Sequence, residues 1–322
     1  MKNHLDNLPK PFFVLAPMDD VTDTVFRQVI TRFAPPDLFF TEFVNVDGLQ
    51  SLGRTKLISK LRLSASEGPT IAQIWGLKPE NFAKTTSELF DMGFAGVDLN
   101  FGCPQKNEVK SGACAALINN KPLAGDIIDA TKEGANGRFP VSVKTRLGYE
   151  KVDFGWHEFL FNKNLNMLTI HGRTKREMSK VPAHWDDIGT IRQLRDELAP
   201  ETLIVGNGDV MNKVQAMNLA KKYKLDGVMI GRGIFSNPLL FAANEEWTTK
   251  TPKEKLELYK IHAELFIKTY KHNEKPIVTL NKFCKTYVNG FDGAKEIRDS
   301  LMHATSAEDL QLRIDQAITL TS

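Results

Sequence analysis

Eight short apolar segments recur between residues 12 and 231, and stretches of helical character separate them. Several are almost continuously apolar, which is typical of parallel strands covered on both faces. A doubly wound open sheet is the structural competitor, but it usually has fewer strands, so the pattern favours a (β/α)8 TIM barrel in the α/β class. The expected strands are Phe12–Pro17, Leu38–Phe43, Thr70–Trp75, Gly96–Phe101, Val141–Thr145, Met167–His171, Thr202–Gly206 and Gly227–Gly231.

The segments between the strands carry helix signals. Pro79–Met92 begins with a proline, which suits the first turn of a helix, and continues with apolar residues among polar ones. Asp186–Leu198 begins with two acidic residues, which are favourable at the positive end of a helix dipole. Asn212–Tyr223 has the same character. These segments are therefore expected to be the crossover helices of the barrel.

The pattern changes after Asn237-Pro238, beyond which no strand-like run of comparable strength follows. Thr251 and Pro252 have the character of an N-cap and of the first helical position, and Glu254 places an acid in the first turn. The sequence therefore predicts two domains: a barrel over residues 1–245 and a small helical domain over residues 246–322.

Composition is that of a soluble globular protein, with 42% hydrophobic and 25% charged residues. No apolar run approaches the length of a membrane span, and the N-terminal residues lack the profile of a signal peptide. Cys103, Cys114 and Cys284 form no CxxC pair and imply no disulfide framework, which favours a reducing, cytoplasmic setting. No motif indicates a protein partner, so a monomer is expected.

Charge is distributed unevenly in the helical region. Over the whole chain, 42 Lys and Arg residues face 39 Asp and Glu residues, a balance that permits a nucleic-acid partner without requiring one. Residues 253–285 alone carry eight Lys against four Glu. Such an excess is usually a solvated helix face, and a grip on backbone phosphates is the alternative.

One cysteine stands where an apolar strand ends abruptly. Gly102 lets the backbone turn after the strand, and Pro104 cannot donate to a ladder. Cys103 lies between them, at the carboxyl end of a strand, which is where barrel enzymes build their active sites. A thiol at that corner is either a small buried core residue or a reactive group.

Other polar residues stand at strand ends, among them Gln73, Lys144 and His171. A lysine within an apolar strand needs either a buried acid or a ligand with an anionic face. Because Gln, Lys, Arg and His converge on one barrel mouth, the pattern favours the ligand, although His171 alone is compatible with a core histidine. The seventh and eighth strands end in the glycine-rich segments 206–209 and 231–233, a usual phosphate site in barrels.

These motifs together resemble those of the tRNA-dihydrouridine synthase family, in order and over nearly the whole chain. Its fold is an FMN-binding (β/α)8 barrel followed by a helical domain. The residues that carry the resemblance are Ala16-Pro17-Met18, Val21-Thr22-Asp23, Gln73, Asp98-Leu99-Asn100-Phe101-Gly102-Cys103-Pro104, Lys144-Thr145-Arg146-Leu147-Gly148, His171-Gly172-Arg173-Thr174, Gly206-Asn207-Gly208-Asp209, Gly231-Arg232-Gly233, Lys282, Tyr287, Gly290, Gly293-Ala294 and Arg298.

The resemblance implies reduction of the C5–C6 double bond of particular uridines in tRNA. NADPH would reduce a tightly bound FMN, a hydride would pass from flavin N5 to uracil C6, and Cys103 would give a proton to C5. The residues it implies for the cofactor are Pro17, Met18, Asp19, Gln73, Lys144, His171, Arg173, Asn207, Gly208, Asp209, Gly231 and Arg232. Those it implies for the substrate are Asn100, Arg146, Lys282, Lys285 and Arg298, and it implies no metal.

Four residues depart from the family's usual pattern without removing a group that this reaction needs. Asp20 and Cys114 stand where glycine is frequent, Ser179 where tyrosine is frequent, and Phe283 where histidine is frequent. Three alternatives remain at this point. One is an FMN-dependent reductase of a free pyrimidine, similar to dihydroorotate dehydrogenases, which would not need the helical domain. The others are a tRNA-binding protein without catalysis and a flavin-free sugar-phosphate enzyme.

Overall fold

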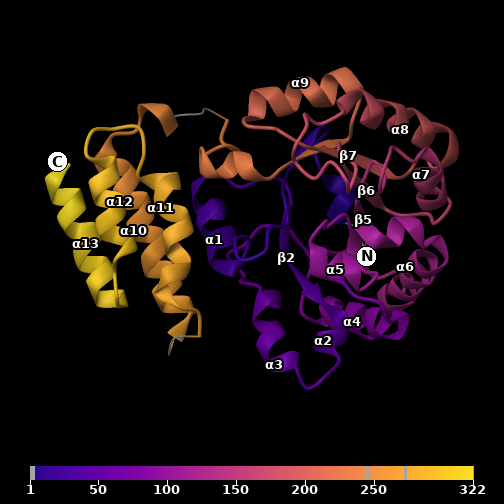
Figure 1. The fold of residues 1–322 in the computed structure, drawn as a ribbon, viewed down its shortest axis with the longest axis horizontal. Coiled ribbons are helices and arrows are strands. Elements are labelled where there is room, and N and C mark those ends of the chain that lie inside the picture. Colours follow the sequence, from indigo (N-terminus) through magenta and orange to yellow (C-terminus); the bar gives the residue numbers. More distant parts are fainter. Residues whose placement is uncertain (1–3, 244–246, 272–273, 322) are drawn as a thin grey trace. The chain divides into compact units, whose positions relative to one another are not determined.

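A computed structural model describes residues 4–243, 247–271 and 274–321. Its eight strands form one parallel sheet in the order β1-β8-β7-β6-β5-β4-β3-β2, and a parallel bridge between Val14 and Leu38 joins β1 to β2. The sheet is therefore closed, which confirms the (β/α)8 barrel (Figure 1). The strands are β1 Phe12–Leu15, β2 Phe39–Asn45, β3 Thr70–Trp75, β4 Gly96–Phe101, β5 Val141–Arg146, β6 Met167–His171, β7 Leu203–Asn207 and β8 Gly227–Ile230.

Helices surround the strands in the barrel (Figure 1). The three expected helices are confirmed, with ends that differ from the prediction by one residue. Asn212 caps one of them by accepting a hydrogen bond from the backbone N–H of Gln215. The helices are α2 Val46–Leu49, α3 Arg54–Leu57, α4 Pro79–Asp91, α5 Lys106–Lys110, α6 Lys121–Ala135, α7 Phe154–Phe161, α8 Trp185–Leu198 and α9 Lys213–Tyr223, and the 3-10 turns are η1 His4–Asn7, η2 Ile58–Leu61 and η3 Cys114–Asn119.

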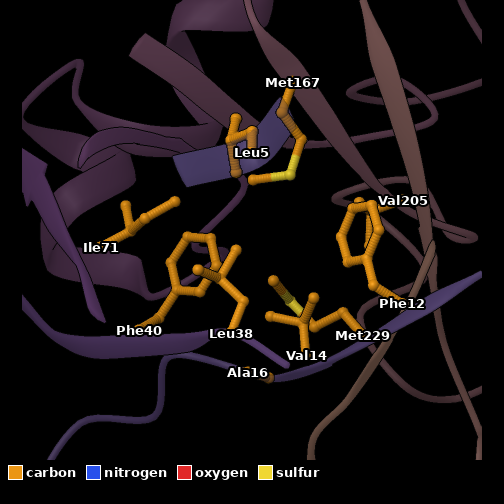
Figure 2. Packing of buried hydrophobic residues seen from close by; sticks show 10 residues of the cluster. All are labelled: Leu5, Phe12, Val14, Ala16, Leu38, Phe40, Ile71, Met167, Val205 and Met229. Atoms are coloured by element: carbon orange, nitrogen blue, oxygen red, sulfur yellow. The ribbon is translucent and has the colours of Figure 1, made fainter. Parts of the chain in front are cut away.

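Apolar side chains fill part of the barrel interior. Because side chains alternate along a strand, every second residue of each strand points inward. The inward residues that are apolar pack into one cluster, and none of them is more than 5% exposed. The polar part of the barrel interior lies next to this cluster. Its members are Leu5, Phe12, Val14, Ala16, Leu38, Phe40, Ile71, Met167, Val205 and Met229 (Figure 2).

A second compact unit consists of residues 25–35 and 232–322. It includes nearly all of α1 (Thr24–Phe33), although this helix lies between β1 and β2 in the chain. The expected domain boundary at 245/246 lies outside the described residues. The remaining elements of this unit are η4 Arg232–Phe235, η5 Trp247–Thr249, η7 Ile277–Leu280, α10 Pro252–Thr269, α11 Asn281–Tyr287, α12 Ala294–Met302 and α13 Ala307–Leu320.

Aromatic packing explains why α1 groups with the C-terminal helices. The ring of Phe26 stacks on Phe283, with centroids 5.1 Å apart, and Phe283 also packs against His262 at 4.7 Å. Phe283 thus fills an apolar position between helices, where it is 3% exposed. At the start of α10, Thr251 and Glu254 form the full capping box.

The closure of the barrel is stabilised by a buried acid. Asp226, just before β8, accepts hydrogen bonds from the backbone N–H of Ile204 at 2.8 Å and from Arg195 Nη1 at 3.2 Å. Its other oxygen accepts from Lys10 Nζ at 2.8 Å. The Asp226 backbone carbonyl accepts from the N–H of Phe12. This single residue ties together the amino-terminal ends of β1, β7 and β8, away from the face where barrel enzymes act.

We predict that Asp226→Ala lowers the free energy of unfolding by about 3 kcal/mol, because it removes the buried acceptor of Arg195 Nη1 and of the Ile204 N–H, while Arg195 Nε keeps its ion pair with Asp196. Lys10→Ala is the matched control and should cost less than about 1 kcal/mol, since the Lys10 side chain is 60% exposed. Urea unfolding followed by tryptophan fluorescence measures both. Equal losses in the two variants would contradict this account of barrel closure.

Candidate active site at the carboxyl ends of the strands

The strand register brings the polar inward residues together. Gln73 on β3 pairs with Asp98 on β4, and Asp98 pairs with Ser142 on β5. One step closer to the carboxyl ends, Asn100 pairs with Lys144. Two residues further along β5, Arg146 begins another row, which continues through His171 and Asn207 on β6 and β7. Five consecutive strands therefore line one side of the barrel mouth with polar groups.

Cys103 stands at the corner after β4, half-buried. Its backbone N–H donates to Asn100 Oδ1 at 2.9 Å, and the N–H of Gly102 donates to the same oxygen at 3.1 Å. A hydrogen bond from the Cys114 thiol lowers the pKa of Cys103 below its ordinary value, and a backbone hydrogen bond from Gln105 adds to this effect. Burial opposes the shift. The corner is thus rigid, and its thiol is more acidic than usual.

Cys114 is fully buried and begins η3. Its φ is 54°, a left-handed conformation that favours glycine. The hydrogen bond to Cys103 and burial raise the pKa of Cys114 far above its ordinary value, so this thiol stays protonated and acts as the donor. Cys114 is therefore a contact of Cys103 rather than only a packed small residue.

A chain of hydrogen bonds leads from β5 to the Cys103 corner. Ser142 Oγ donates to Asp98 Oδ1 at 2.6 Å, and Gln73 Nε2 donates to Asp98 Oδ2 at 2.7 Å. Asn100 Nδ2 then donates to Gln73 Oε1 at 3.1 Å. Asp98 is 0% exposed and Gln73 is 1% exposed. Gln73 and Asn100 thus hold each other through their amides.

Lys144 lies on the same inward face, half-buried. Among the described residues, no hydrogen-bond acceptor is found for its Nζ. Burial, together with the charge of Arg146, lowers the pKa of Lys144 to about 8, while Asp98 and Cys103 act in the opposite direction. An ammonium group in this position suits a ligand with an anionic face.

Arg146 is buried and binds backbone carbonyls on both sides of the site. Its Nε donates to Gly102 O at 2.7 Å, and its Nη1 donates to Thr174 O and Met178 O at 3.0 and 3.1 Å. These three hydrogen bonds do not involve Nη2. Arg146 therefore joins the turn before Cys103 to the loop after β6.

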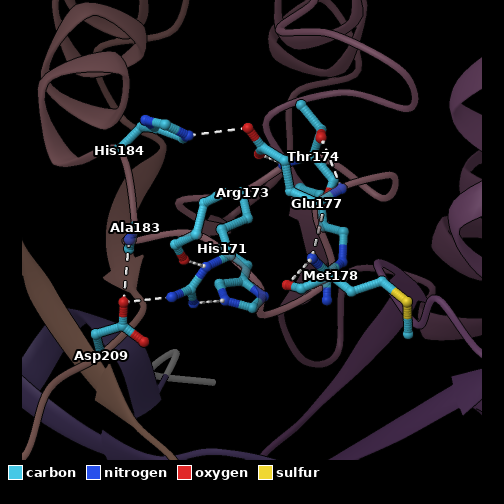
Figure 3. Close-up of polar contacts among 10 residues, drawn as sticks. His171, Arg173, Thr174, Glu177, Met178, Ala183, His184 and Asp209 are labelled. Carbon is cyan, nitrogen blue, oxygen red and sulfur yellow. Dashed lines mark hydrogen bonds and ion pairs between the residues drawn. The ribbon is translucent and has the colours of Figure 1, made fainter.

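The loop after β6 is fixed by a second arginine (Figure 3). Arg173, 3% exposed, forms an ion pair with Asp209 and donates to the carbonyl of Val181, while its Nη1 lies 3.3 Å from His171 Nε2. Asp209 also accepts from the backbone N–H of Ala183 at 3.0 Å. His171, Arg173 and Asp209, all implied for the cofactor, are therefore brought together, but Arg173 and Asp209 mainly hold this loop.

The two glycine-rich turns lie at the ends of β7 and β8. Gly208 has φ 140°, and a Cβ there would lie 2.7 Å from the Cβ of Ala183, so only glycine fits. Asn207 Nδ2 donates to the carbonyl of Met229 at 2.9 Å. A Cβ on Gly231 would meet only Ala16 and, at 4.0 Å, the sulfur of Met18, which leaves its backbone open to a ligand. Arg232 follows as an exposed residue that begins η4.

The loop after β1 carries the other residues implied for the cofactor. Pro17 and Met18 are half-buried, and Thr22 Oγ1 accepts from the backbone N–H of Met18 at 3.0 Å. Asp19 is exposed and forms an ion pair with Lys60. The loop is therefore ordered by its own hydrogen bonds, and Met18 lies beside Gly231.

The residues implied for tRNA in the helical unit differ in their surroundings. Lys282 and Lys285 on α11 are both exposed. Arg298 on α12 is half-buried, and its Nη1 donates to the carbonyl of Val288 at 2.7 Å. Arg298 therefore has a structural role within this unit, whereas the side chains of the two lysines are exposed.

Sequence reasoning did not assign roles to Asp98 and Ser142. The available signal was an acid inside an apolar strand, two residues from Asn100 and hence on the same face of β4.

The described part of the chain contains no helix long and apolar enough to cross a membrane. It also contains no group of His, Cys, Asp and Glu residues arranged to hold a metal ion.

Comparisons with known proteins agree with this geometry. The family model described as dihydrouridine synthase matches residues 14–321. A probable tRNA-dihydrouridine synthase of Staphylococcus aureus (strain Mu50 / ATCC 700699) is 46% identical over 318 residues, which cover 98% of this chain and 95% of the relative. Probable tRNA-dihydrouridine synthase 2 of Bacillus subtilis (strain 168) is 43% identical over 318 residues, which cover 98% and 96% of the two chains.

Solved structures with a similar fold are more distant in sequence. Morphinone reductase in complex with tetrahydroNAD has a TM-score of 0.51 at 14% identity, covering 75% of this chain and 90% of that chain. Histamine dehydrogenase from Rhizobium sp. 4-9 has a TM-score of 0.53 at 12% identity, covering 79% and 48%. At these identities the likeness is one of fold.

We predict that Cys114→Ala raises the pKa of Cys103 toward its ordinary value, because the variant removes the hydrogen bond that contributes most to the shift. The pH midpoint for alkylation of Cys103 by iodoacetamide should move upward. Cys114→Ser is the matched control, since its hydroxyl can still donate, and its midpoint should stay nearer to wild type. An unchanged midpoint in Cys114→Ala would contradict the thiol contact.

Proposed function

This chain belongs to the dihydrouridine synthase family, and on that premise we propose that it is a flavin-dependent oxidoreductase that reduces the C5–C6 double bond of uridines in tRNA. The observation that carries this proposal is the Cys103 thiol, held at the carboxyl end of β4 beside the inward ammonium group of Lys144. A free-pyrimidine reductase is not favoured, because the family match extends through the helical unit to residue 321.

The residues at the barrel mouth fit a flavin mononucleotide. Lys144 on β5 would offer a positive charge to the flavin ring, and Gln73 lies two strands away, on β3. The open backbone at Gly231 suits a phosphate group, and Gly208 stands in the other glycine-rich turn. When bound, FMN that has been reduced by NADPH would supply the hydride that adds to uracil C6. Pro17, Met18, Asp19, His171, Arg173, Asn207, Asp209 and Arg232 complete the proposed cofactor site.

Cys103 is the proposed general acid. Hydride addition at C6 makes C5 carbanion-like, so C5 must receive a proton from a group held within reach. The Sγ of Cys103 gives that proton to C5, and the lowered pKa makes it a stronger acid than an ordinary thiol. Asn100 fixes the backbone on which this thiol stands.

Lys144 stabilises negative charge during the reaction. Its pKa of about 8 leaves it protonated at neutral pH. A preorganised cation in a buried site stabilises developing charge more strongly than one in water. Arg146, whose Nη2 takes no part in the carbonyl clamp, is the proposed second contact to the target base, together with Asn100.

The substrate is a folded tRNA from which a uridine must swing out, at a cost of a few kcal/mol for unstacking. The exposed Lys282 and Lys285 are the proposed contacts to its backbone phosphates, with Arg298 supporting α11. We place the reaction in the cytoplasm, where tRNA and NADPH are available, and assign it to a monomer.

Cys103→Ala should leave flavin binding and reduction by NADPH intact, while dihydrouridine formation falls by at least about 100-fold, the usual worth of a general acid. Flavin absorbance and a dihydrouridine assay on unmodified tRNA measure the two steps separately. Cys284→Ala is the matched control, since Cys284 is buried in the helical unit, and it should remain active. Normal dihydrouridine formation by Cys103→Ala would refute the acid role.

The double variant Lys282→Glu with Lys285→Glu should weaken tRNA binding by about tenfold or more at moderate salt, and flatten the salt dependence, because two phosphate contacts become repulsive. Flavin absorbance should be unchanged. Lys221→Glu with Lys222→Glu on α9 makes the same change in net charge and should bind tRNA almost normally. If both pairs weaken binding equally, the effect is one of net charge, and the role of α11 is lost.

A further inference from the structure

Asp98 is a charged group buried in the middle of a strand, and none of the roles above uses it. It is 0% exposed, and it accepts hydrogen bonds from Ser142 and Gln73. We propose that Asp98 is a positioning residue whose carboxylate sets the direction of the hydrogen-bond chain that ends on the backbone N–H groups of Gly102 and Cys103. The inference deepens the proposed function and rests on it for the chemistry at Cys103.

The direction of the chain follows from what each end can do. An ionised carboxylate can only accept, so Gln73 must turn its NH2 group toward Asp98 and its oxygen toward Asn100. At the other end, backbone N–H groups can only donate, so Asn100 must turn its oxygen toward the Gly102–Cys103 turn. Both ends therefore demand the same orientation of the two amides.

The oxygen that sets this order is Oδ2, which accepts from Gln73 Nε2 at 2.7 Å. A hydrogen on Oδ2 would face a group that already donates, whereas a hydrogen on Oδ1 could be accepted by Ser142 Oγ, whose own hydrogen can turn to the Val97 carbonyl 3.4 Å away. Without an acceptor at Oδ2, Gln73 would be free to turn its amide over, and its oxygen would then no longer meet the NH2 group of Asn100. The acceptor at Oδ2 of Asp98 is thus what fixes the corner bearing Cys103.

Keeping this charge buried costs stability. Burial raises the pKa of Asp98 from 3.8 to about 6, against the lowering effects of Ser142, Gln73 and the charge of Lys144. The folded state therefore binds the proton more tightly than the unfolded state, and stability falls as the pH rises from about 4 to about 6. An apolar residue of similar size would avoid this loss but could not accept from Gln73, so the polar group is better explained by the contact it makes at the site.

The first experiment is hydrogen exchange of the peptide containing Gly102 and Cys103, measured by mass spectrometry at pH 7. Asp98→Ala should exchange these two amides at least tenfold faster, while the other strands keep their protection. Asp98→Asn should restore protection, because its oxygen can accept from Gln73 while its NH2 donates to Ser142. Thr145→Val is the matched control: it removes a buried hydroxyl of β5 that bonds Phe101 and Trp156 outside the chain, and should leave the two amides protected.

Two exchange results would overturn the proposal. One is unchanged protection of Gly102 and Cys103 in Asp98→Ala. The other is a loss of protection throughout the sheet, which would mean that Asp98 only supports the fold. Neither reading depends on flavin, NADPH or tRNA, so the exchange result stands whether or not the proposed function holds.

The second experiment follows dihydrouridine formation per bound flavin. Asp98→Ala should lower this rate, whereas Asp98→Asn should keep most of it, because its oxygen can still accept from Gln73. In a Gln73→Ala background, Asp98→Ala should have no further effect, because both act through the same amide. An equal loss of rate in Asp98→Asn and Asp98→Ala, or additive losses in the double variant, would refute the role in catalysis.

Discussion

Closure of the eight-stranded barrel is the constraint on which the site depends. Once β1 and β2 meet through the Val14–Leu38 bridge, every second residue of each strand must point into a shared interior. Apolar residues such as Met167 and Val205 fill one part of that interior, and β3 to β7 contribute polar residues to the rest. The site is therefore not a feature added to a finished core. The register that packs the apolar cluster is the same register that aligns Gln73 with Asp98 and Asn100 with Lys144.

Charge in this interior is balanced by contacts between unlike groups. Burial and the charge of Arg146 disfavour the protonated form of Lys144, and Asp98 offsets part of that effect. The charge of Lys144 in turn favours the ionised form of Asp98. Arg146 also favours the thiolate of Cys103, but the larger influence on that thiol is the neutral contact with Cys114. The protonation states of acid, base and thiol are thus coupled across two adjacent strands, so a substitution at one of them changes the others.

The barrel could be predicted from the sequence because the residues that end its strands are easily recognised. β3, β4 and β6 have the predicted ends, and β4 and β6 each lead into a glycine, Gly102 or Gly172. The sequence also drew attention to Cys103 and Lys144, which are conspicuous in apolar surroundings, and their roles stay predictions. It could not show that α1 groups with the C-terminal helices, since the contact between Phe26 and Phe283 joins positions far apart in the chain. Nor could it show that Arg146 and Arg173 hold backbone carbonyls, because those partners carry no side-chain signal.

Backbone strain near the site is explained by what the strained side chains contact. Asp20 and Cys114 have φ values of 58° and 54°, and both replace a glycine that is frequent in the family. A non-glycine residue in this region costs on the order of 1 kcal/mol or more, so it persists only where the surroundings compensate. At Cys114 the compensation is visible, since its buried thiol donates to Cys103. Glycine would relieve the strain and remove the donor. At this position, local stability is thus lower and the neighbouring thiol, Cys103, is more acidic.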